Sequence, residues 1–324
     1  MRQFIFIAFL FSQLFFVQSC VKDDNSSNDD TSCGLQLTRI NDLPFDLDTG
    51  SILDFFVFNE TAYLFYKPNA TIVELHKYNE VSDSWEYVSV LPNTGSIESK
   101  IYTFIIGDFV YLAFSEVNSN NIPLKLFQYD PINISWEEKT GTTFPDKGWS
   151  GQISINSFSL DNLGYLFSTS NEENFRMYNP ITNSWELKTG FLTYEFINHV
   201  GFTFSNSIYI LGGGCYNFDC YSSSIYKYNS SLDEWTSSSM PTNYGFSGKE
   251  NGFVFNNNVY VFGQLENDAS QLTLFNKVEN STDWSKKVSC ENFFITALFN
   301  LGSKGYIQVD YPYEMRGQIY KISL

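Results

Sequence analysis

Residues 178–185 read Tyr-Asn-Pro-Ile-Thr-Asn-Ser-Trp, and this tyrosine-to-tryptophan pattern recurs along the chain. Equivalent segments lie at residues 78–85, 129–136 and 228–235, and a longer version that starts with phenylalanine lies at residues 275–284. Five of the six tryptophans therefore follow one another at intervals of 51, 49, 50 and 49 residues. A regular period of about 20 to 50 residues indicates a repeat protein, in which each unit buries its apolar face by stacking on its neighbours.

A second pattern consists of six short apolar strands, each with a tyrosine near its centre. The tyrosines are Tyr63, Tyr111, Tyr165, Tyr209, Tyr260 and Tyr306. Each strand is preceded by another apolar run across a two-residue turn, for example Asn59-Glu60 or Gly107-Asp108, which is typical of β-hairpins. Since no segment shows a helical period, the two patterns together predict an all-β fold with six units of four short antiparallel strands.

The repeated aromatic residues are expected to belong to the core. In the segment quoted above, Pro180 presets φ for a turn and Asn179 accepts local backbone hydrogen bonds, so that Trp185 returns close to Tyr178. Sheets that radiate from an axis diverge outward, and neighbouring sheets pack about 10 Å apart. Large side chains at these outer positions would fill the widening wedge between neighbouring sheets.

The four-stranded units resemble degenerate kelch repeats, as in the galactose oxidase-like six-bladed β-propellers, and the resemblance covers residues 34–324. The glycine doublet that ends the second strand in that family is clear at Gly212-Gly213, is reduced to Gly263 in the next unit and is missing from the others. The resemblance implies a six-bladed β-propeller of four-stranded antiparallel blades.

The sixth unit stops after its third strand, at residues 318–322, without a tryptophan-bearing fourth strand. Residues 34–40 alternate between apolar and polar side chains and can supply that strand from the other end of the chain. Pairing the two ends within one blade would leave only short sheet edges exposed, which is how propellers protect their edges. Removal of residues 34–44 is therefore expected to destabilise the whole fold.

The N-terminal residues predict export and lipid anchoring. Residues 1–19 carry one positive charge and then an apolar run that is too short for a membrane span, as in a secretory signal peptide. The run ends in Val17-Gln18-Ser19-Cys20, which resembles a bacterial lipobox and implies a lipid on Cys20. Residues 20–33 form a polar, acidic tether, whose start, Val21-Lys22-Asp23-Asp24, resembles the cell-surface signal of Bacteroidetes lipoproteins. The expected location is the outer membrane, at the cell surface, and the alternative is a secreted protein that discards Cys20 with its signal peptide.

The charge of the chain argues against two kinds of partner. Aspartate and glutamate number 36 against 19 lysines and arginines, which gives a formal net charge of −17. Binding to nucleic acid depends on neutralising phosphates with basic side chains, and no basic run occurs here. Electrostatic docking on anionic lipid is disfavoured for the same reason, so the lipid anchor is the membrane contact expected.

The cysteines suggest one local disulfide. Cys215 and Cys220 are close in sequence within one loop, and a disulfide between them is expected in an oxidising compartment. A metal site would need further cysteine or histidine ligands nearby, so no metal or other cofactor is predicted. Cys33 and Cys290 remain, at opposite ends of their expected strands, and their pairing stays open.

Candidate ligand-binding residues lie in the segments that link blades and in the turns between second and third strands, which should emerge on the same face. Trp149 stands outside the tryptophan repeat, so a packing role is less obvious for it. Aromatic rings mixed with polar groups suit sugar rings or peptide segments, although the same rings could simply cover the blade ends. The candidates are Trp149, Tyr194, Tyr216, Phe218, Tyr244, Phe246, Lys249, Tyr311, Tyr313 and Arg316.

An enzymatic function is the weaker interpretation. Copper chemistry of the galactose oxidase kind would need histidine ligands, and His76 and His199 fall in different units. A carbohydrate-active propeller similar to sialic acid mutarotases would need cationic groups beside an acid or base. The candidates are Arg316, Lys147 and Lys249 for the first task and His199, Glu195 and Glu172 for the second. Because no spacing joins them into a motif, a lipid-anchored protein that binds a glycan or a protein is favoured.

Overall fold

The computed structural model describes residues 36–40, 43, 51–69, 71–92, 101–115, 121–145, 155–168, 173–190, 199–212, 224–239, 252–255, 258–265, 268–278, 284–291, 294–301, 304–310 and 318–323. Within these residues the chain forms six antiparallel sheets of four strands each. The described residues contain no helix with the length and apolar character that crossing a bilayer requires.

Each of the first three sheets contains four consecutive strands, and we number these sheets as blades 1 to 3. Blade 1 contains β2 (Ser51–Phe58), β3 (Thr61–Asn69), β4 (Ile72–Asn79) and β5 (Ser84–Val90). Blade 2 contains β6 (Ile101–Ile106), β7 (Phe109–Ser115), β8 (Asn121–Asp130) and β9 (Ser135–Pro145). Blade 3 contains β10 (Ile155–Leu160), β11 (Leu163–Ser168), β12 (Phe175–Asn179) and β13 (Ser184–Leu187).

Blades 4 and 5 repeat this arrangement, whereas blade 6 combines the two ends of the chain. Blade 4 contains β14 (Val200–Phe204), β15 (Ser207–Leu211), β16 (Ser224–Asn229) and β17 (Glu234–Ser239). Blade 5 contains β18 (Gly252–Phe255), β19 (Asn258–Leu265), β20 (Asp268–Val278) and β21 (Trp284–Glu291). Blade 6 contains β22 (Phe294–Leu301), β23 (Lys304–Asp310), β24 (Gln318–Ser323) and β1 (Gln36–Arg39).

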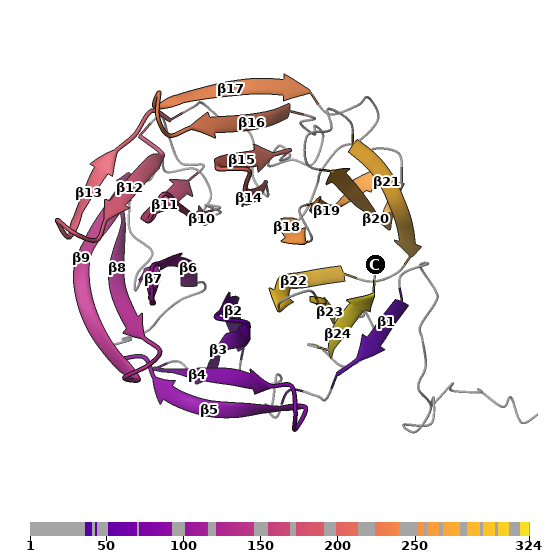
Figure 1. The fold of residues 1–324 in the computed structure, drawn as a ribbon, viewed down its shortest axis with the longest axis horizontal. Helices are drawn as coiled ribbons and strands as arrows, with labels where there is room; N and C mark the ends of the chain where they lie inside the picture. The colour runs from indigo at the N-terminus through magenta and orange to yellow at the C-terminus, as the bar shows by residue number, and fades with distance from the viewer. Residues whose placement is uncertain are drawn as a thin grey trace, which may run out of the picture.

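The six sheets stand around a common axis, with their first strands innermost (Figure 1). Contacts between these strands run in the order β2, β6, β10, β14, β18 and β22 and return from β22 to β2, so the ring is closed. The fourth strands form the perimeter. The predicted six-bladed β-propeller of four-stranded antiparallel blades is confirmed.

The N-terminal strand completes the last blade, as the sequence predicted. β1 pairs antiparallel with β24, with Gln36 opposite Ser323 and Arg39 opposite Tyr320. The backbone N–H of Ile40 continues the ladder by donating to the carbonyl of Ile319 at 3.1 Å. The ring is therefore closed by hydrogen bonds between the two ends of the chain.

A phenylalanine stands opposite each of the six repeated tyrosines across the first hairpin of the blade. The pairs are Phe56 and Tyr63, Phe104 and Tyr111, Phe158 and Tyr165, Phe202 and Tyr209, Phe253 and Tyr260, and Phe299 and Tyr306. In blades 1, 2 and 4 the two rings stack with centroids 5.0, 5.5 and 5.4 Å apart. Such cross-strand aromatic pairs stabilise a sheet, and the phenylalanines repeat the sixfold period of the tyrosines.

The repeated tyrosines of the third strands are core residues, as predicted. Tyr129, Tyr178 and Tyr228 are at most 1% exposed. Each packs against the tryptophan that follows it, with ring centroids 4.5 to 5.1 Å apart. Trp136 and Trp185 are only half-buried, because the fourth strand is an edge and one side of its indoles faces solvent.

Candidate functional site

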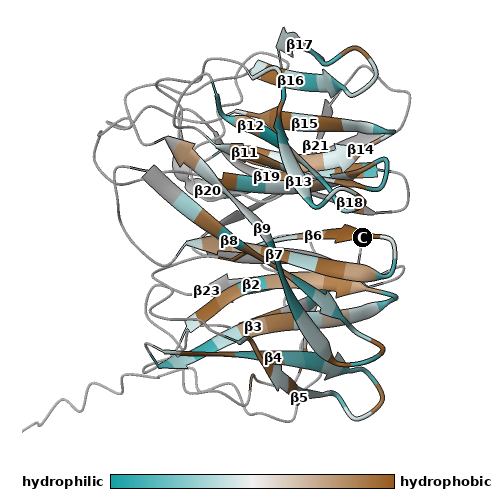
Figure 2. Cartoon of the chain, turned by 90° about the vertical axis from the view of Figure 1, so that its left-hand side faces the viewer, coloured by the Kyte–Doolittle hydropathy of each residue, from teal (hydrophilic) through white to brown (hydrophobic). Residues whose placement is uncertain are grey.

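The two faces of the propeller differ in the connections that they carry. In every blade two residues join the first strand to the second, and in blades 1 to 4 four residues join the third strand to the fourth. At Asn59-Glu60, Asp161-Asn162 and Ser205-Asn206 both turn residues have positive φ, which is the geometry of tight hairpin turns. These turns share one face, which we call the tight-turn face and which lies on the right of Figure 2.

The opposite face, which we call the loop face, receives the connections from second to third strands and the links between blades. The connections from second to third strands range from residues 70–71 in blade 1 to residues 212–223 in blade 4, and the links range from residues 292–293 to residues 188–199. Because strand direction alternates within a blade, the strand ends that these segments join all lie on this face.

All ten candidate ligand-binding residues fall in segments that join strand ends on the loop face. They are Trp149, Tyr194, Tyr216, Phe218, Tyr244, Phe246, Lys249, Tyr311, Tyr313 and Arg316, and all ten lie outside the described residues. The strand order therefore assigns their segments to one face, and their roles stay predictions.

The other sequence-based candidates also lie mostly outside the described residues. Cys20, Cys33, Cys215 and Cys220 are among these, and for Cys290 only the backbone within β21 is described. The predicted lipid on Cys20 and the predicted disulfide between Cys215 and Cys220 therefore stay predictions. Of the candidates for acid or base chemistry, His199 is the one whose side chain is described.

Polar side chains on the inner strands of blades 1 to 3 form a chain of hydrogen bonds around part of the axis. The Thr103 hydroxyl donates to Asp54 Oδ2 at 2.5 Å, and the Ser157 hydroxyl donates to the Thr103 carbonyl at 2.7 Å. The backbone N–H of Ile105 donates to Ser159 Oγ at 2.7 Å. These bonds join β2, β6 and β10 and fix the spacing of the strands into which the blade links lead.

A sequence feature that the tyrosine and tryptophan repeats do not include marks these hydrogen-bonded residues. Thr103 and Ser157 each come directly before the repeated phenylalanine of an inner strand.

Burial raises the pKa of the neighbouring Tyr102 to about 12, and the charge of Asp54 adds to the effect. The Tyr102 phenol is therefore neutral at physiological pH.

His199 lies between blades 3 and 4 at the point where the link enters β14. Its side chain is 5% exposed and meets the Phe167 ring edge-on, with centroids 5.3 Å apart. Within the described part of the chain, neither ring nitrogen of His199 has a hydrogen-bond partner, and neither has Oδ1 of Asn156. Burial lowers the pKa of His199 to about 4, so the imidazole is neutral at pH 7. As an acid or base, His199 would act only on a group that reaches this buried place.

The two histidines lie in different blades. His76 lies in β4 of blade 1, where its Nε2 is 2.9 Å from Oε2 of Glu74, whereas His199 belongs to blade 4. Among the described residues, no three histidine, cysteine, aspartate or glutamate side chains are grouped as a metal ion would require.

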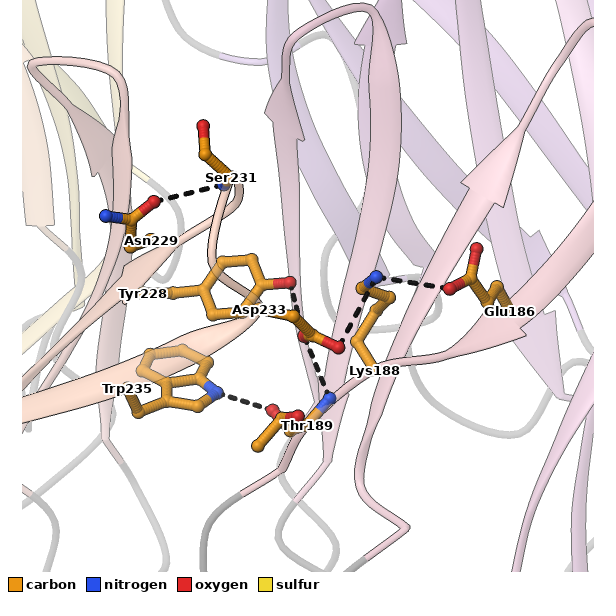
Figure 3. A network of polar contacts seen from close by, with 8 residues as sticks. All are labelled: Glu186, Lys188, Thr189, Tyr228, Asn229, Ser231, Asp233 and Trp235. Atoms are coloured by element: carbon orange, nitrogen blue, oxygen red, sulfur yellow. Dashed lines mark hydrogen bonds and ion pairs between the residues drawn. The ribbon is translucent and has the colours of Figure 1, made fainter.

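Neighbouring blades are joined at the perimeter by a network of polar contacts (Figure 3). Asp233 Oδ1 in the turn before β17 accepts the Tyr228 hydroxyl at 2.8 Å and the backbone N–H of Thr189 in blade 3 at 3.0 Å. The indole N–H of Trp235 donates to the carbonyl of the same Thr189 at 2.7 Å. Both backbone groups of Thr189 are thus bound by side chains of blade 4, and we call this arrangement the blade clamp.

Charge also contributes to the clamp between blades 3 and 4. Lys188 Nζ lies 3.5 Å from Asp233 Oδ2 and 3.1 Å from Glu186 Oε1. Burial alone would raise the pKa of Asp233, but the hydrogen bonds from Tyr228 and Thr189 and the charge of Lys188 outweigh it, and the pKa is lowered. The carboxylate is therefore ionised throughout the physiological range.

The same clamp joins blade 3 to blade 2. Asn183 Oδ1 accepts the Tyr178 hydroxyl at 2.9 Å and the backbone N–H of Thr140 at 2.9 Å. Trp185 donates to the carbonyl of Thr140 at 2.7 Å. The tyrosine and tryptophan of the sequence repeat, together with the aspartate or asparagine between them, therefore hold adjacent blades at a fixed distance.

Comparisons with known proteins agree with this architecture. No family model matches the chain. The chain is 26% identical to Kelch-like protein 36 of Bos taurus over 175 residues, which make up 52% of this chain and 27% of that protein. The chain thus spans about a quarter of the length of that relative. The solved structure of YjhT matches with a TM-score of 0.56 and 12% identity over 87% of this chain and 95% of YjhT, a likeness of fold alone. These similarities support a kelch-type β-propeller.

Proposed function

We propose that this chain is a lipid-anchored binding protein of the outer membrane, displayed at the cell surface, that holds a glycan or a protein segment on its loop face. The observation that carries the proposal is the contrast between the two faces. The turns between first and second strands are equally short in all six blades, whereas the loop-face connections range from residues 70–71 to residues 212–223. Binding residues are concentrated on variable loops that a rigid scaffold positions.

The described residues supply such a scaffold. The hydrogen bonds from Asp54 through Thr103 to Ser157 fix the inner strands, and the blade clamps fix the perimeter. A site built on rigid elements loses less conformational freedom when a ligand binds. The segments that carry the ten candidate residues therefore begin and end on strands that are held in place.

The charge of the chain and the composition of its loop-face segments favour particular ligands. A net charge of −17 disfavours a polyanionic ligand and is compatible with neutral glycans and with neutral or basic peptide segments. Eight of the ten candidates are tyrosine, tryptophan or phenylalanine, and such rings offer apolar area with few rotatable bonds.

The binding face is tested by alanine substitution. Trp149→Ala, Tyr244→Ala and Tyr313→Ala should each weaken binding to glycan arrays or to a captured protein ligand, while the thermal unfolding temperature stays within experimental error. Tyr87→Ala is the matched control, because Tyr87 is 58% exposed on β5 at the perimeter, away from the loop face. If the three loop-face variants fold and bind like the unsubstituted chain, the assignment of the face is wrong.

The lipid anchor is tested separately. Cells that express the chain are grown with radiolabelled fatty acid, and label should enter the protein and be lost in Cys20→Ser. Protease added to intact cells should digest the labelled protein if it is displayed at the surface. Labelled protein that resists this protease until the cells are broken would contradict surface display.

A further inference from the structure

Five aliphatic side chains project from the turns between third and fourth strands in blades 1 to 4. They are Val81, Ile132, Ile134, Ile181 and Leu232, with exposed fractions of 99%, 79%, 54%, 92% and 64%. We call them the apolar rim; the turns that carry them lie on the right of Figure 2, where their tips are brown. Single exposed apolar residues are ordinary, but five of the nine large ones among the described residues share this turn.

The turns do not need these side chains for their own structure. The side-chain oxygen of Asn79 accepts the backbone N–H of Val81 at 3.0 Å, and Asp130 and Asn179 bind the corresponding N–H groups of Ile132 and Ile181 at 2.9 Å. Aspartate or asparagine in this role sets the turn by itself. The residue at the tip is thus free to be polar, and a repeated aliphatic residue there indicates contact with an apolar environment.

Ile134 gives a second and independent reason. It adopts φ of 51°, a left-handed conformation that is a genuine outlier for a β-branched residue. Asp83, Asn183 and Asp233 occupy the same position in blades 1, 3 and 4, and each accepts the hydroxyl of its own tyrosine. Blade 2 thus replaces a clamp residue by a strained, half-exposed isoleucine, a substitution that costs stability in the free protein. Strain of this kind is found where a residue serves a function.

The chain that leads to the proposed lipid anchor leaves the propeller at the same rim. In blade 6 the turn between third and fourth strands is replaced by the two ends of the chain, because β24 ends beside the start of β1. Gln36, opposite Ser323, therefore stands where the other blades place an apolar tip. Residues 20–35 lead from Cys20 to this point. They are long enough to reach either face when extended, at about 3.3–3.6 Å per residue, so the apolar rim decides which face meets the membrane.

We propose that the apolar rim inserts into the surface of a zwitterionic bilayer, so that the tight-turn face rests on the membrane and the loop face points away from it. This orientation rests on the proposed lipid anchor. Separated aliphatic tips around a perimeter suit a fluid interface, which closes around each tip, whereas a protein interface needs a continuous packed centre. Carboxylates next to the tips, such as Glu80 and Asp83, oppose binding to anionic lipid.

The test uses the mature chain from residue 20, which contains every described strand, with Cys20→Ala so that no lipid is attached. This chain should float with phosphatidylcholine vesicles, with no loss of binding when NaCl is raised to about 0.5 M, because screening weakens only charge attraction. Replacing the four tips by Val81→Ser, Ile132→Ser, Ile181→Ser and Leu232→Ser should lower the partition coefficient at least fivefold. Tyr87→Ser with Leu187→Ser is the control, because both are exposed on perimeter strands and outside the turns; it should leave partition unchanged.

Ile134→Asn separates membrane contact from stability. Asparagine tolerates positive φ and could accept the Tyr129 hydroxyl as Asn183 accepts that of Tyr178. This variant should unfold at a higher urea concentration than the parent chain and yet bind vesicles less tightly. If Ile134 had only a structural role, Ile134→Asn would raise the stability of the chain without weakening its binding to vesicles.

Several results would overturn the orientation. The orientation is wrong if the parent chain does not float with the vesicles or if the four-serine variant floats equally well. It is also wrong if binding appears only with anionic lipid and disappears in salt. A concentration-dependent dimer in analytical ultracentrifugation that the four-serine variant abolishes would instead make a second copy the occupant. Because the chain used in the vesicle experiment carries no lipid, these results are independent of the fatty-acid labelling that tests the anchor itself.

Discussion

Replacing Asp233 tests the blade clamp most directly. Asp233→Gly removes the carboxylate that accepts the Tyr228 hydroxyl and the Thr189 N–H and that pairs with Lys188. Glycine adds no strain at this site, where φ is 53°. Asp233→Asn is the matched control, because Asn183 makes the same two hydrogen bonds in blade 3. It removes the charge and keeps the acceptor.

The magnitude follows from the surroundings of each partner. Tyr228 is fully buried, and a buried hydroxyl that loses its acceptor costs about 1–3 kcal/mol. The Thr189 N–H is exposed, so water replaces most of its lost hydrogen bond. The pair with Lys188 contributes about 0–1 kcal/mol, as expected for an ion pair near the surface. Asp233→Gly should therefore lower the free energy of unfolding by about 2–3 kcal/mol, and Asp233→Asn by less than about 1 kcal/mol.

Urea unfolding followed by tryptophan fluorescence and circular dichroism measures both variants. The pH dependence adds a check of sign. The pKa of Asp233 is lowered in the folded state, so its contribution is complete above the ordinary value of 3.8 and is lost as the pH falls through the lowered value. The difference between the unsubstituted chain and Asp233→Asn should shrink over this acid range. Equal destabilisation by glycine and asparagine at pH 7, or none by either, would refute the clamp.

Three further predictions concern stability. Deleting residues 34–44 removes the partner of β24 and should lower the calorimetric unfolding temperature of the whole propeller, and an unchanged temperature would show that the ring does not depend on its closure. Gly164→Ala would drive a methyl group into the Phe104 ring of blade 2 and should cost about 1–3 kcal/mol in urea unfolding; Gly107→Ala, with open space but φ of 57°, should cost about 1–2 kcal/mol. Burial lowers the pKa of His199 to about 4, so the unfolded chain gains a proton first as the pH falls below 6.5. His199 should cost about 2 kcal/mol of stability between pH 7 and pH 5, and His199→Leu should abolish that part of the dependence; a slope that survives the substitution belongs to other groups.

Much of the fold could be predicted because the same side chains recur in each structural repeat. The tyrosines and tryptophans recur near every 50 residues, and the two-residue turns between first and second strands require residues that tolerate positive φ, as at Asn59-Glu60. The same repetition showed that one strand was missing from the last unit and that residues 34–40 could supply it.

The blade clamp could not be predicted in the same way. Asp233 and Trp235 bind backbone groups of Thr189, which lies 44 and 46 residues earlier. Any residue at that position would offer the same N–H and carbonyl, so its identity leaves no pattern in the sequence. The pairing becomes visible only when neighbouring blades are placed side by side.

The candidate site divides along the same line. The sequence showed which segments are rich in aromatic residues, and the strand order decided that these segments join strand ends on one face. The burial of His199, by contrast, depends on Phe167 in the neighbouring blade. The sequence does not show whether a histidine at the start of a strand faces a ligand or is buried in the core.

By itself, the sequence determined the number of blades, their hairpins and the strand that closes the ring, because each depends on a local period or on turn chemistry that recurs along the chain. Only the tertiary structure decided which side chains bind the backbone of the neighbouring blade and which faces carry the tight turns and the variable connections. It also decided where the aliphatic turn tips lie relative to the start of β1. The physical reason is that these features depend on groups far apart in the chain, brought together when the six sheets close around one axis.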